Sequence, residues 1–374
     1  MNQSRKHIFL SLVLFLIWNT VLIDHGFAAE PEPHGTASGM KAPSAWSYSA
    51  GINGTLPVTD MVCPTQKVCF ASAVNQVVKT TDSGKIFYTV FKEPNVEPGT
   101  LSARTSIWFI DSKTGFAGIP GNGYTAVKTR DGGKSWKEFK DQAFAGRFGF
   151  FDEMRGISGT QGGLMFTRDG GKSWQHGEIF KNKEGKEKVT LSDFVYSRPS
   201  LVRKNQNVMT GFFVVFQSAP SAPPASHLIK TDDGGSIWTI VNSDLPHNLR
   251  SVFFKDRDHG WVGTADGHIL KTTDGGGTWK DGAVSGGEIR QIQCLTKENC
   301  YAISVGMIYL TIDSGNRWTQ LQPVDVGRPI VMETIAFMDS NLGLIGGGLA
   351  EIKGLKNQAI ASYTTTGGIL KLNH

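Results

Sequence analysis

Hydrophobic and polar residues alternate along most of the chain, in short runs that glycine-rich turns separate. The clearest example spans residues 249–279 and reads LRSVFFKDRDHGWVGTADGHILKTTDGGGTW. Alternation with a period of two is typical of β-strands with one face buried. It predicts strands at about residues 250–255, 260–264 and 268–272, and a fourth from Thr278 onward. One such unit is therefore a four-stranded antiparallel meander.

One turn motif recurs along the chain, with the pattern Thr-x-Asp-x-Gly-x-x-aromatic. Its six aspartates are Asp82, Asp131, Asp169, Asp233, Asp274 and Asp313. A seventh segment, YTTTGGIL, keeps Thr364 and Gly368 but has Thr366 in the aspartate position. An Asp carboxylate can accept hydrogen bonds from backbone N–H groups just ahead, and Gly tolerates the positive φ of a tight turn. The motif therefore predicts a structural hairpin turn, with its aromatic ring buried against a neighbouring sheet.

The spacing of the motif predicts the fold. Consecutive motifs stand 38 to 64 residues apart, enough for one four-stranded sheet each. Solenoid repeats are usually shorter and rarely hold four strands, whereas such units are typical of β-propellers, whose closure also protects strand edges. We expect an all-β, seven-bladed β-propeller of four-stranded antiparallel blades over residues 46–374. Residues 46–52 and the last unit should meet in one blade and close the ring.

The repeated turn resembles the Asp-box (BNR) repeat. The surrounding pattern, matched by Phe254, Asp256, Gly260, Trp261 and Gly267, resembles the propeller family named for photosystem II assembly and stability factors. The resemblance covers roughly residues 46–374. It implies a non-catalytic protein that binds or helps assemble a partner complex, and those propellers are described as using an Arg-rich surface for partner proteins.

The four cysteines form two pairs with equal spacing, Cys63 with Cys69 and Cys294 with Cys300. Each pair lies at the same distance from the following box aspartate, so the two pairs occupy the same place in two blades. In the blade of residues 249–279 that place aligns with Lys255 and Trp261, on the first hairpin. We therefore expect two disulfides that bridge adjacent strands. A zinc site is the alternative, but two distant pairs without a histidine cluster do not favour it.

The first 28 residues have the features of a secretory signal peptide. Arg5 and Lys6 precede an apolar run at residues 9–23, and Gly26 and Ala28 suit a cleavage site after Ala28. The alternative, a retained anchor, needs an apolar run of about 20 residues. We expect an exported protein, periplasmic or secreted, with a flexible segment at residues 29–45 and no integral membrane segment after cleavage. Disulfides agree with an oxidising compartment.

Composition and residue spacing argue against nucleic-acid, metal and cofactor binding. The chain is 39% hydrophobic and 19% charged, with 45 glycines, which fits a globular, turn-rich β protein. Its net charge of +5 comes without the Lys/Arg runs that nucleic-acid binding requires, so we expect no nucleic-acid partner. The nine histidines show no ligand spacing, and each box supplies one carboxylate where a calcium loop needs several. No metal and no cofactor are predicted.

Alignment of the blades on their boxes places arginines at the start of several innermost strands. These residues are Arg104, Arg147, Arg250 and Arg290. The equivalent places hold Val58 or Thr59 in the first blade, Ser192 or Asp193 in the fourth and Glu333 in the seventh. A ring of guanidinium groups on one face would favour an anionic ligand or an acidic protein patch.

Two functions remain open from the sequence. The first is a non-catalytic module that binds a partner protein or an envelope or membrane complex through the arginine-bearing face. The alternative is a glycan-acting hydrolase of the sialidase type, because sialidases also carry Asp boxes and bind a carboxylate with three arginines. The chain shows no Arg-Ile-Pro motif near its amino end, and seven units suit a six-bladed sialidase poorly. We therefore expect no catalytic residues.

Overall fold

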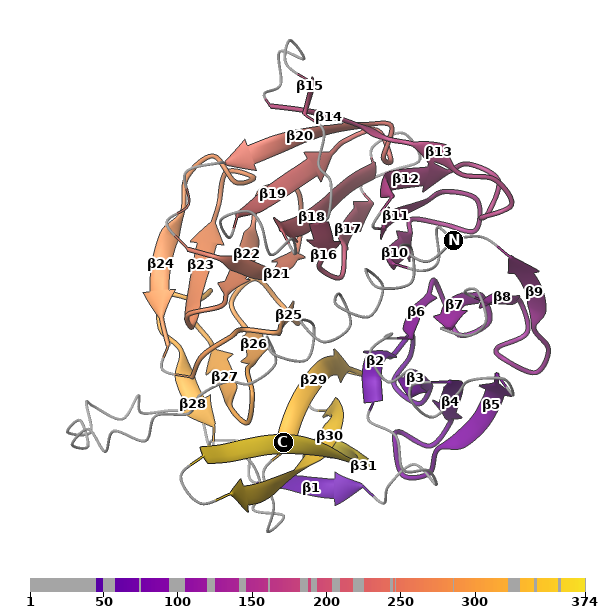
Figure 1. Ribbon diagram of the computed structural model, residues 1–374, viewed down its shortest axis with the longest axis vertical. Helices are drawn as coiled ribbons and strands as arrows, with labels where there is room; N and C mark the ends of the chain where they lie inside the picture. The colour runs from indigo at the N-terminus through magenta and orange to yellow at the C-terminus, as the bar shows by residue number, and fades with distance from the viewer. Residues whose placement is uncertain are drawn as a thin grey trace, which may run out of the picture.

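The chain forms a ring of β-sheets around a common axis (Figure 1). The computed structural model describes residues 45–49, 58–73, 75–93, 105–119, 125–140, 146–160, 162–181, 188–189, 194–203, 209–217, 225–242, 245, 247–284, 286–321, 330–339, 342–355 and 358–373. Strands in these residues form seven sheets, which confirms the predicted all-β, seven-bladed propeller. None of the described residues belongs to a helix long and apolar enough to span a bilayer. Cleavage after Ala28 concerns residues outside the described part.

Five blades are four-stranded antiparallel meanders whose first strand lies innermost, against the first strands of neighbouring blades. Blade one comprises β2 (Val58–Val62), β3 (Cys69–Ala73), β4 (Gln76–Thr80) and β5 (Tyr88–Lys92). Blade two comprises β6 (Ser106–Phe109), β7 (Gly115–Ile119), β8 (Thr125–Thr129) and β9 (Lys137–Lys140). Blade three comprises β10 (Arg147–Phe150), β11 (Gly156–Thr160), β12 (Gly163–Thr167) and β13 (Gln175–His176).

Blades five and six repeat this plan. Blade five comprises β21 (Leu249–Phe254), β22 (Gly260–Thr264), β23 (His268–Thr272) and β24 (Lys280–Ala283). Blade six comprises β25 (Gln291–Cys294), β26 (Cys300–Ile303), β27 (Ile308–Thr311) and β28 (Thr319–Leu321). In blade five the second and third strands have the predicted bounds, and the first begins one residue earlier.

Blade four is the exception, with seven strands. They are β14 (Glu178–Phe180), β15 (Lys188–Val189), β16 (Phe194–Tyr196), β17 (Ser200–Arg203), β18 (Met209–Gln217), β19 (Ser226–Thr231) and β20 (Ile237–Asn242). β16 and β17 both pair with β18, so the innermost strand is broken at residues 197–199. β14 follows blade three's last strand directly and pairs with β20 in parallel, which joins blade three to blade four.

Blade seven closes the ring, as predicted. Its strands are β29 (Ile330–Phe337), β30 (Leu342–Leu355), β31 (Gln358–Asn373) and, from the other end of the chain, β1 (Ala45–Ser49). β1 begins one residue before the expected boundary at residue 46 and pairs with β31 (Figure 1). The seventh Asp-box turn was wrongly predicted, because Thr364, Thr366 and Gly368 lie within β31. With the fourth strand supplied by β1, the chain makes no turn there.

Candidate functional site

The box aspartates point at their own turns. In blade five, Asp274 Oδ1 accepts hydrogen bonds from Thr272 Oγ1 at 2.8 Å and the Thr278 backbone N–H at 2.9 Å. Thr272 Oγ1 in turn accepts the N–H of Gly276, whose φ is 101°. The same network of threonine, aspartate and glycine forms at Asp82, Asp131, Asp169, Asp233 and Asp313. These six carboxylates are committed to turn structure.

These hydrogen bonds also change the acidity of the box carboxylates. Partial desolvation acts to raise the pKa of Asp169, but bonds from Ser173 and Thr167 outweigh it and lower the pKa to about 2. For Asp274, the backbone and hydroxyl of Thr278 hold the pKa well below its ordinary value. The carboxylates of Asp169 and Asp274 therefore stay ionised at neutral pH, as acceptors of backbone hydrogen bonds.

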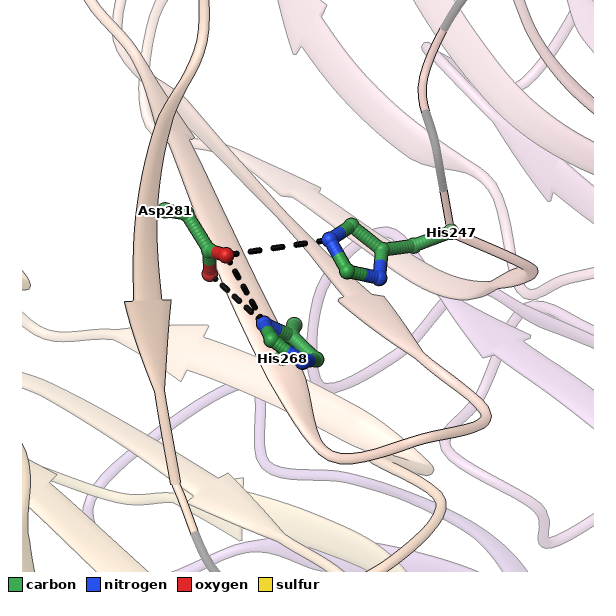
Figure 2. A group of neighbouring side chains, drawn as sticks. All are labelled: His247, His268 and Asp281. Atoms are coloured by element: carbon green, nitrogen blue, oxygen red, sulfur yellow. Dashed lines mark hydrogen bonds and ion pairs between the residues drawn. The ribbon is translucent and has the colours of Figure 1, made fainter.

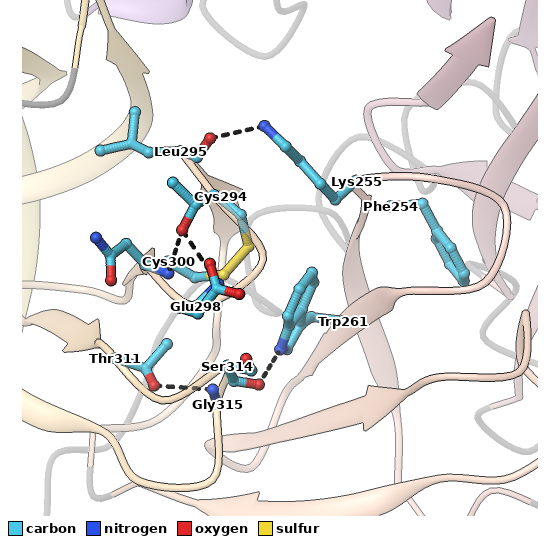
Figure 3. Close-up of a disulfide and its surroundings, with 12 residues drawn as sticks. Phe254, Lys255, Trp261, Cys294, Leu295, Glu298, Cys300, Thr311, Ser314 and Gly315 are labelled. Carbon is cyan, nitrogen blue, oxygen red and sulfur yellow. Dashed lines mark hydrogen bonds between the residues drawn. A yellow bond between two sulfur atoms is a disulfide. The ribbon is translucent and has the colours of Figure 1, made fainter. Parts of the chain in front are cut away.

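The two cysteine pairs are disulfide-bonded, with Cα–Cα distances of 4.0 Å for Cys63–Cys69 and 3.9 Å for Cys294–Cys300. Cys294 and Cys300 lie opposite each other on β25 and β26 (Figure 3). In blade five the equivalent place belongs to Phe254 and Gly260, not to Lys255 and Trp261 as the sequence alignment suggested. The aligned positions are wrong by one residue, because the turn between the second and third strands is one residue longer in blade five than in blade six. Gly260 and Cys300 each face the threonine of their box turn, but Thr272 follows Gly260 by 12 residues and Thr311 follows Cys300 by 11.

The predicted arginines occupy two different positions at the start of the innermost strands. Arg147 pairs with Gly159, and the equivalent place in blade five belongs to Ser251, which pairs with Gly263. Arg250 is the residue before that place, where a β-bulge interrupts the register, and Glu333 sits at a matching bulge in β29. Arg104 lies outside the described residues. The described arginines are therefore not one ring of equivalent side chains.

Arg250 and Arg290 are paired with carboxylates of the same rim. Arg250 Nε lies 3.3 Å from Glu288 Oε1, and Arg290 Nε lies 3.8 Å from Glu288 Oε2. Arg290 Nη1 also pairs with Glu333 Oε1, which joins blades six and seven. Because two glutamates face these two arginines, this part of the rim is close to neutral.

Asp60, in blade one, contacts the side chains of two arginines, from blades three and four. Its carboxylate, with 3% of the side chain exposed, pairs with Arg198 Nη1 and lies 3.9 Å from Arg147 Nη1. It also accepts the backbone N–H groups of Met61 at 3.0 Å and Ile107 at 3.1 Å. One buried carboxylate thus joins blades one to four. Two arginines facing one aspartate leave a formal charge of +1.

Arg198 was missed by sequence reasoning. It lies in the break between β16 and β17, whereas the sequence alignment predicts the fourth blade's residue at Ser192 or Asp193, which lie outside the described residues. Its guanidinium carbon stands 5.3 Å from the centre of the Trp108 ring. Both of its hydrogen bonds, to Asp60 and to the Met61 carbonyl, use Nη1. Among the described residues, Nε and Nη2 have no hydrogen-bond partner.

A cavity of about 390 Å³, here called the axial cavity, runs along the innermost strands. Six blades line it, and its charged lining residues are Arg198, Lys255 and Arg290. Asp and Glu are absent from the described lining. Gln293 also lines the cavity, and its buried Oε1 has no hydrogen-bond partner in the described part of the chain. The lining can therefore attract an anionic group and still offers one acceptor.

The comparisons with known proteins agree with the fold. Residues 224–347 match the family model of the photosynthesis system II assembly factor YCF48. A solved structure of YCF48 bound to D1 peptide is similar at 20% identity and a TM-score of 0.61, over 90% of this chain and 98% of that one. YCF48 from Cyanidioschyzon merolae is similar at 16% identity and a TM-score of 0.60, over 88% and 99%.

Other propellers are also similar in fold. A GH74 xyloglucanase from Xanthomonas campestris has 13% identity and a TM-score of 0.59, over 86% of this chain and 56% of that one. No curated protein sequence matches the chain. At these identities the solved structures show similarity of fold alone, and the match to the family model covers residues 224–347 only. The chain is thus an Asp-box β-propeller that resembles the YCF48 photosystem II assembly factors.

Proposed function

We propose that this protein is a non-catalytic binding module that holds an acidic segment of a partner protein at the axial cavity. The observation that carries the proposal is the described cavity lining, whose charged residues are Arg198, Lys255 and Arg290 and which contains no Asp or Glu. The carboxylates that pair with the two arginines, Asp60, Glu288 and Glu333, stand outside this lining. Arg forms strong charge-assisted hydrogen bonds with carboxylates. The family resemblance supports the same role, since one similar structure is YCF48 bound to a peptide.

Arg198 is the residue best placed to bind the partner. Asp60 and the Trp108 ring fix its position, while Nε and Nη2 can still donate hydrogen bonds. A guanidinium held this way loses little side-chain entropy when it binds a carboxylate. Arg290 is matched by Glu333 and Glu288, so we assign it to the structure of the rim.

The test is a titration by fluorescence anisotropy with short acidic peptides and with the same peptides carrying amides in place of carboxylates. We expect the acidic peptides to bind and R198Q to weaken binding roughly tenfold, which corresponds to about 1.4 kcal/mol. The matched control is R130Q, because Arg130 is an exposed arginine on a box turn, 3.2 Å from Glu153. Equal binding by R198Q and R130Q, with unchanged melting temperatures, would refute the assignment.

The alternative, a glycan hydrolase, has its own readout. Most glycoside hydrolases use two carboxylates on either side of the bond that is cleaved, whereas sialidases use a Tyr nucleophile. The box aspartates are held in turns, and Asp60 is buried in ion pairs. Turnover of a fluorogenic sialoside or xyloglucan fragment by the purified protein would favour the enzyme over the binding module.

Export is part of the same proposal. The residues that carry it are the basic pair Arg5 and Lys6, the apolar run at residues 9–23 and the small residues before the predicted cleavage site. The two disulfides support an oxidising compartment. The intact mass of protein purified from its host should correspond to a chain that starts at Ala29. A full-length mass would contradict cleavage.

A further inference from the structure

Two histidines and two aspartates from distant parts of blade five meet at one point. His247 precedes β21, Asp266 lies in the turn between β22 and β23, His268 begins β23, and Asp281 lies on β24. Figure 2 shows the two imidazoles and Asp281 facing one another. The histidines show no ligand spacing in the sequence, because only the turn and the strand pairing of this blade bring these residues together.

The donor atoms have the separations of a metal site. His268 Nδ1 lies 2.8 Å and His247 Nε2 lies 3.7 Å from Asp281 Oδ2, and one ligand atom from each of the three residues falls within 4.8 Å of the others. A tetrahedral zinc ion with bonds of about 2.0–2.1 Å holds its ligand atoms roughly 3.3 Å apart. Small side-chain movements would therefore complete the coordination.

Asp266 stands behind the histidines as an orienting carboxylate. Its Oδ2 lies 2.9 Å from His247 Nδ1, so the imidazole donates that N–H and directs the lone pair of Nε2 towards Asp281. The same oxygen lies 4.0 Å from His268 Nε2, and Thr264 Oγ1 donates to Oδ1 at 2.5 Å. A carboxylate that accepts the second N–H of a ligating histidine is a common feature of metal sites, and its loss typically weakens affinity 10- to 100-fold.

The charge of the cluster also suits a divalent cation. The two imidazole rings are stacked with centroids 4.0 Å apart. A histidine that binds a metal is neutral, so in the metal-bound form Asp266 and Asp281 give a formal charge of −2 to the protein side of the site. Imidazole nitrogens prefer Zn²⁺ and its neighbours in the first transition row, whereas Mg²⁺ and Ca²⁺ prefer oxygen ligands.

We propose that His247, His268 and Asp281 bind a divalent transition-metal ion, represented by Zn²⁺, with Asp266 orienting the histidines. Three protein ligands leave a fourth position for water or for a group from a partner. Because Arg250 lies three residues after His247, the site is near the rim of the propeller that carries the arginines. The ion would link His247, just before β21, to the outer strands β23 and β24 of blade five.

The experiment is isothermal titration of chelator-treated, tag-free full-length protein with Zn²⁺ alone. We expect one equivalent to bind, H268N and D281N to abolish binding, and D266N to weaken it 10- to 100-fold. The matched control is H259N, because His259 also contacts an aspartate, Asp256, at 2.9 Å on the same blade. Co²⁺ should give the visible absorption of a four-coordinate site in wild type and H259N.

Each other outcome has a definite meaning. No binding by wild type, or equal binding by wild type, H268N and D281N, would overturn the proposal. Unchanged Zn²⁺ affinity in D266N would remove its orienting role. The melting temperature of the metal-free variants serves as the check on folding. Competition by Mg²⁺ or Ca²⁺ at a concentration equal to that of Zn²⁺ would contradict the assigned metal class.

Discussion

Blades five and six form the same inner hairpin in two chemically different ways. In blade six, Cys294 and Cys300 are joined covalently across β25 and β26. In blade five, the equivalent pair is Phe254 and Gly260, and a Cβ on that glycine would stand 2.4 Å from the Phe254 ring. The aromatic ring thus covers the glycine of the opposite strand. Phe–Gly pairs occupy the same place at Phe109–Gly115, Phe150–Gly156 and Phe337–Gly343.

The two hairpins differ in what they connect. The ring of Phe254 stacks on Phe212 of blade four with centroids 3.6 Å apart, so it stabilises the contact between blades as well as its own hairpin. The disulfide of blade six closes its own hairpin and packs beside Trp261 of blade five, whose Nε1 donates to the Ser314 carbonyl (Figure 3). Packing between blades should therefore depend more on the phenylalanines than on the cysteines.

The largest expected effect comes from F254A. It removes a buried ring, 3% exposed, from two blades, and such substitutions typically cost about 3–5 kcal/mol. Urea unfolding of F254A and of wild type should show this loss in the free energy of unfolding. I237A provides the control, because Ile237 is 52% exposed. A loss below about 1 kcal/mol in F254A would mean that the stack does not hold blades four and five together.

A smaller effect is expected when the sixth hairpin loses its disulfide. Closing so short a loop contributes about 2 kcal/mol on chain-entropy grounds. The double variant C294A/C300A should therefore be less stable than oxidised wild type by about that amount, and dithiothreitol should abolish most of the difference. A loss as large as that of F254A would reverse the comparison between the two hairpins.

The smallest difference between blades five and six should appear in their contribution to stability at acid pH, because both blades contain the same box turn. Hydrogen bonds from the turn lower the pKa of Asp274, and they outweigh desolvation to lower the pKa of Asp313. A lowered folded-state pKa contributes stability that is present above the unfolded pKa of about 4 and is lost as pH falls through the folded value. Denaturation followed from pH 5 downward should show similarly reduced acid sensitivity in D274N and D313N. A marked difference between them would mean that hairpin chemistry affects the turn.

Much of the fold could be predicted because its signals are local. The alternating strands of blade five and the Thr-x-Asp-x-Gly turn are encoded within about thirty residues. The candidate site was less predictable, because it depends on registers between blades. Arg147 and Arg250 look equivalent in the sequence, but a bulge separates their positions, and Arg198 enters through an interrupted strand. The contacts among His247, His268 and Asp281 likewise require the folded blade.

The pairing of β1 with β31 has a consequence for biogenesis. Six of the sheets can assemble in the order in which the chain emerges, but the seventh combines β29, β30 and β31 with β1, which precedes all the other blades in the sequence. Until synthesis delivers β31, the nascent ring is an open arc with unpaired edges at both ends. Such an arc is exposed to aggregation and to proteases. Pairing of β31 with β1 is therefore also the step that protects the ring.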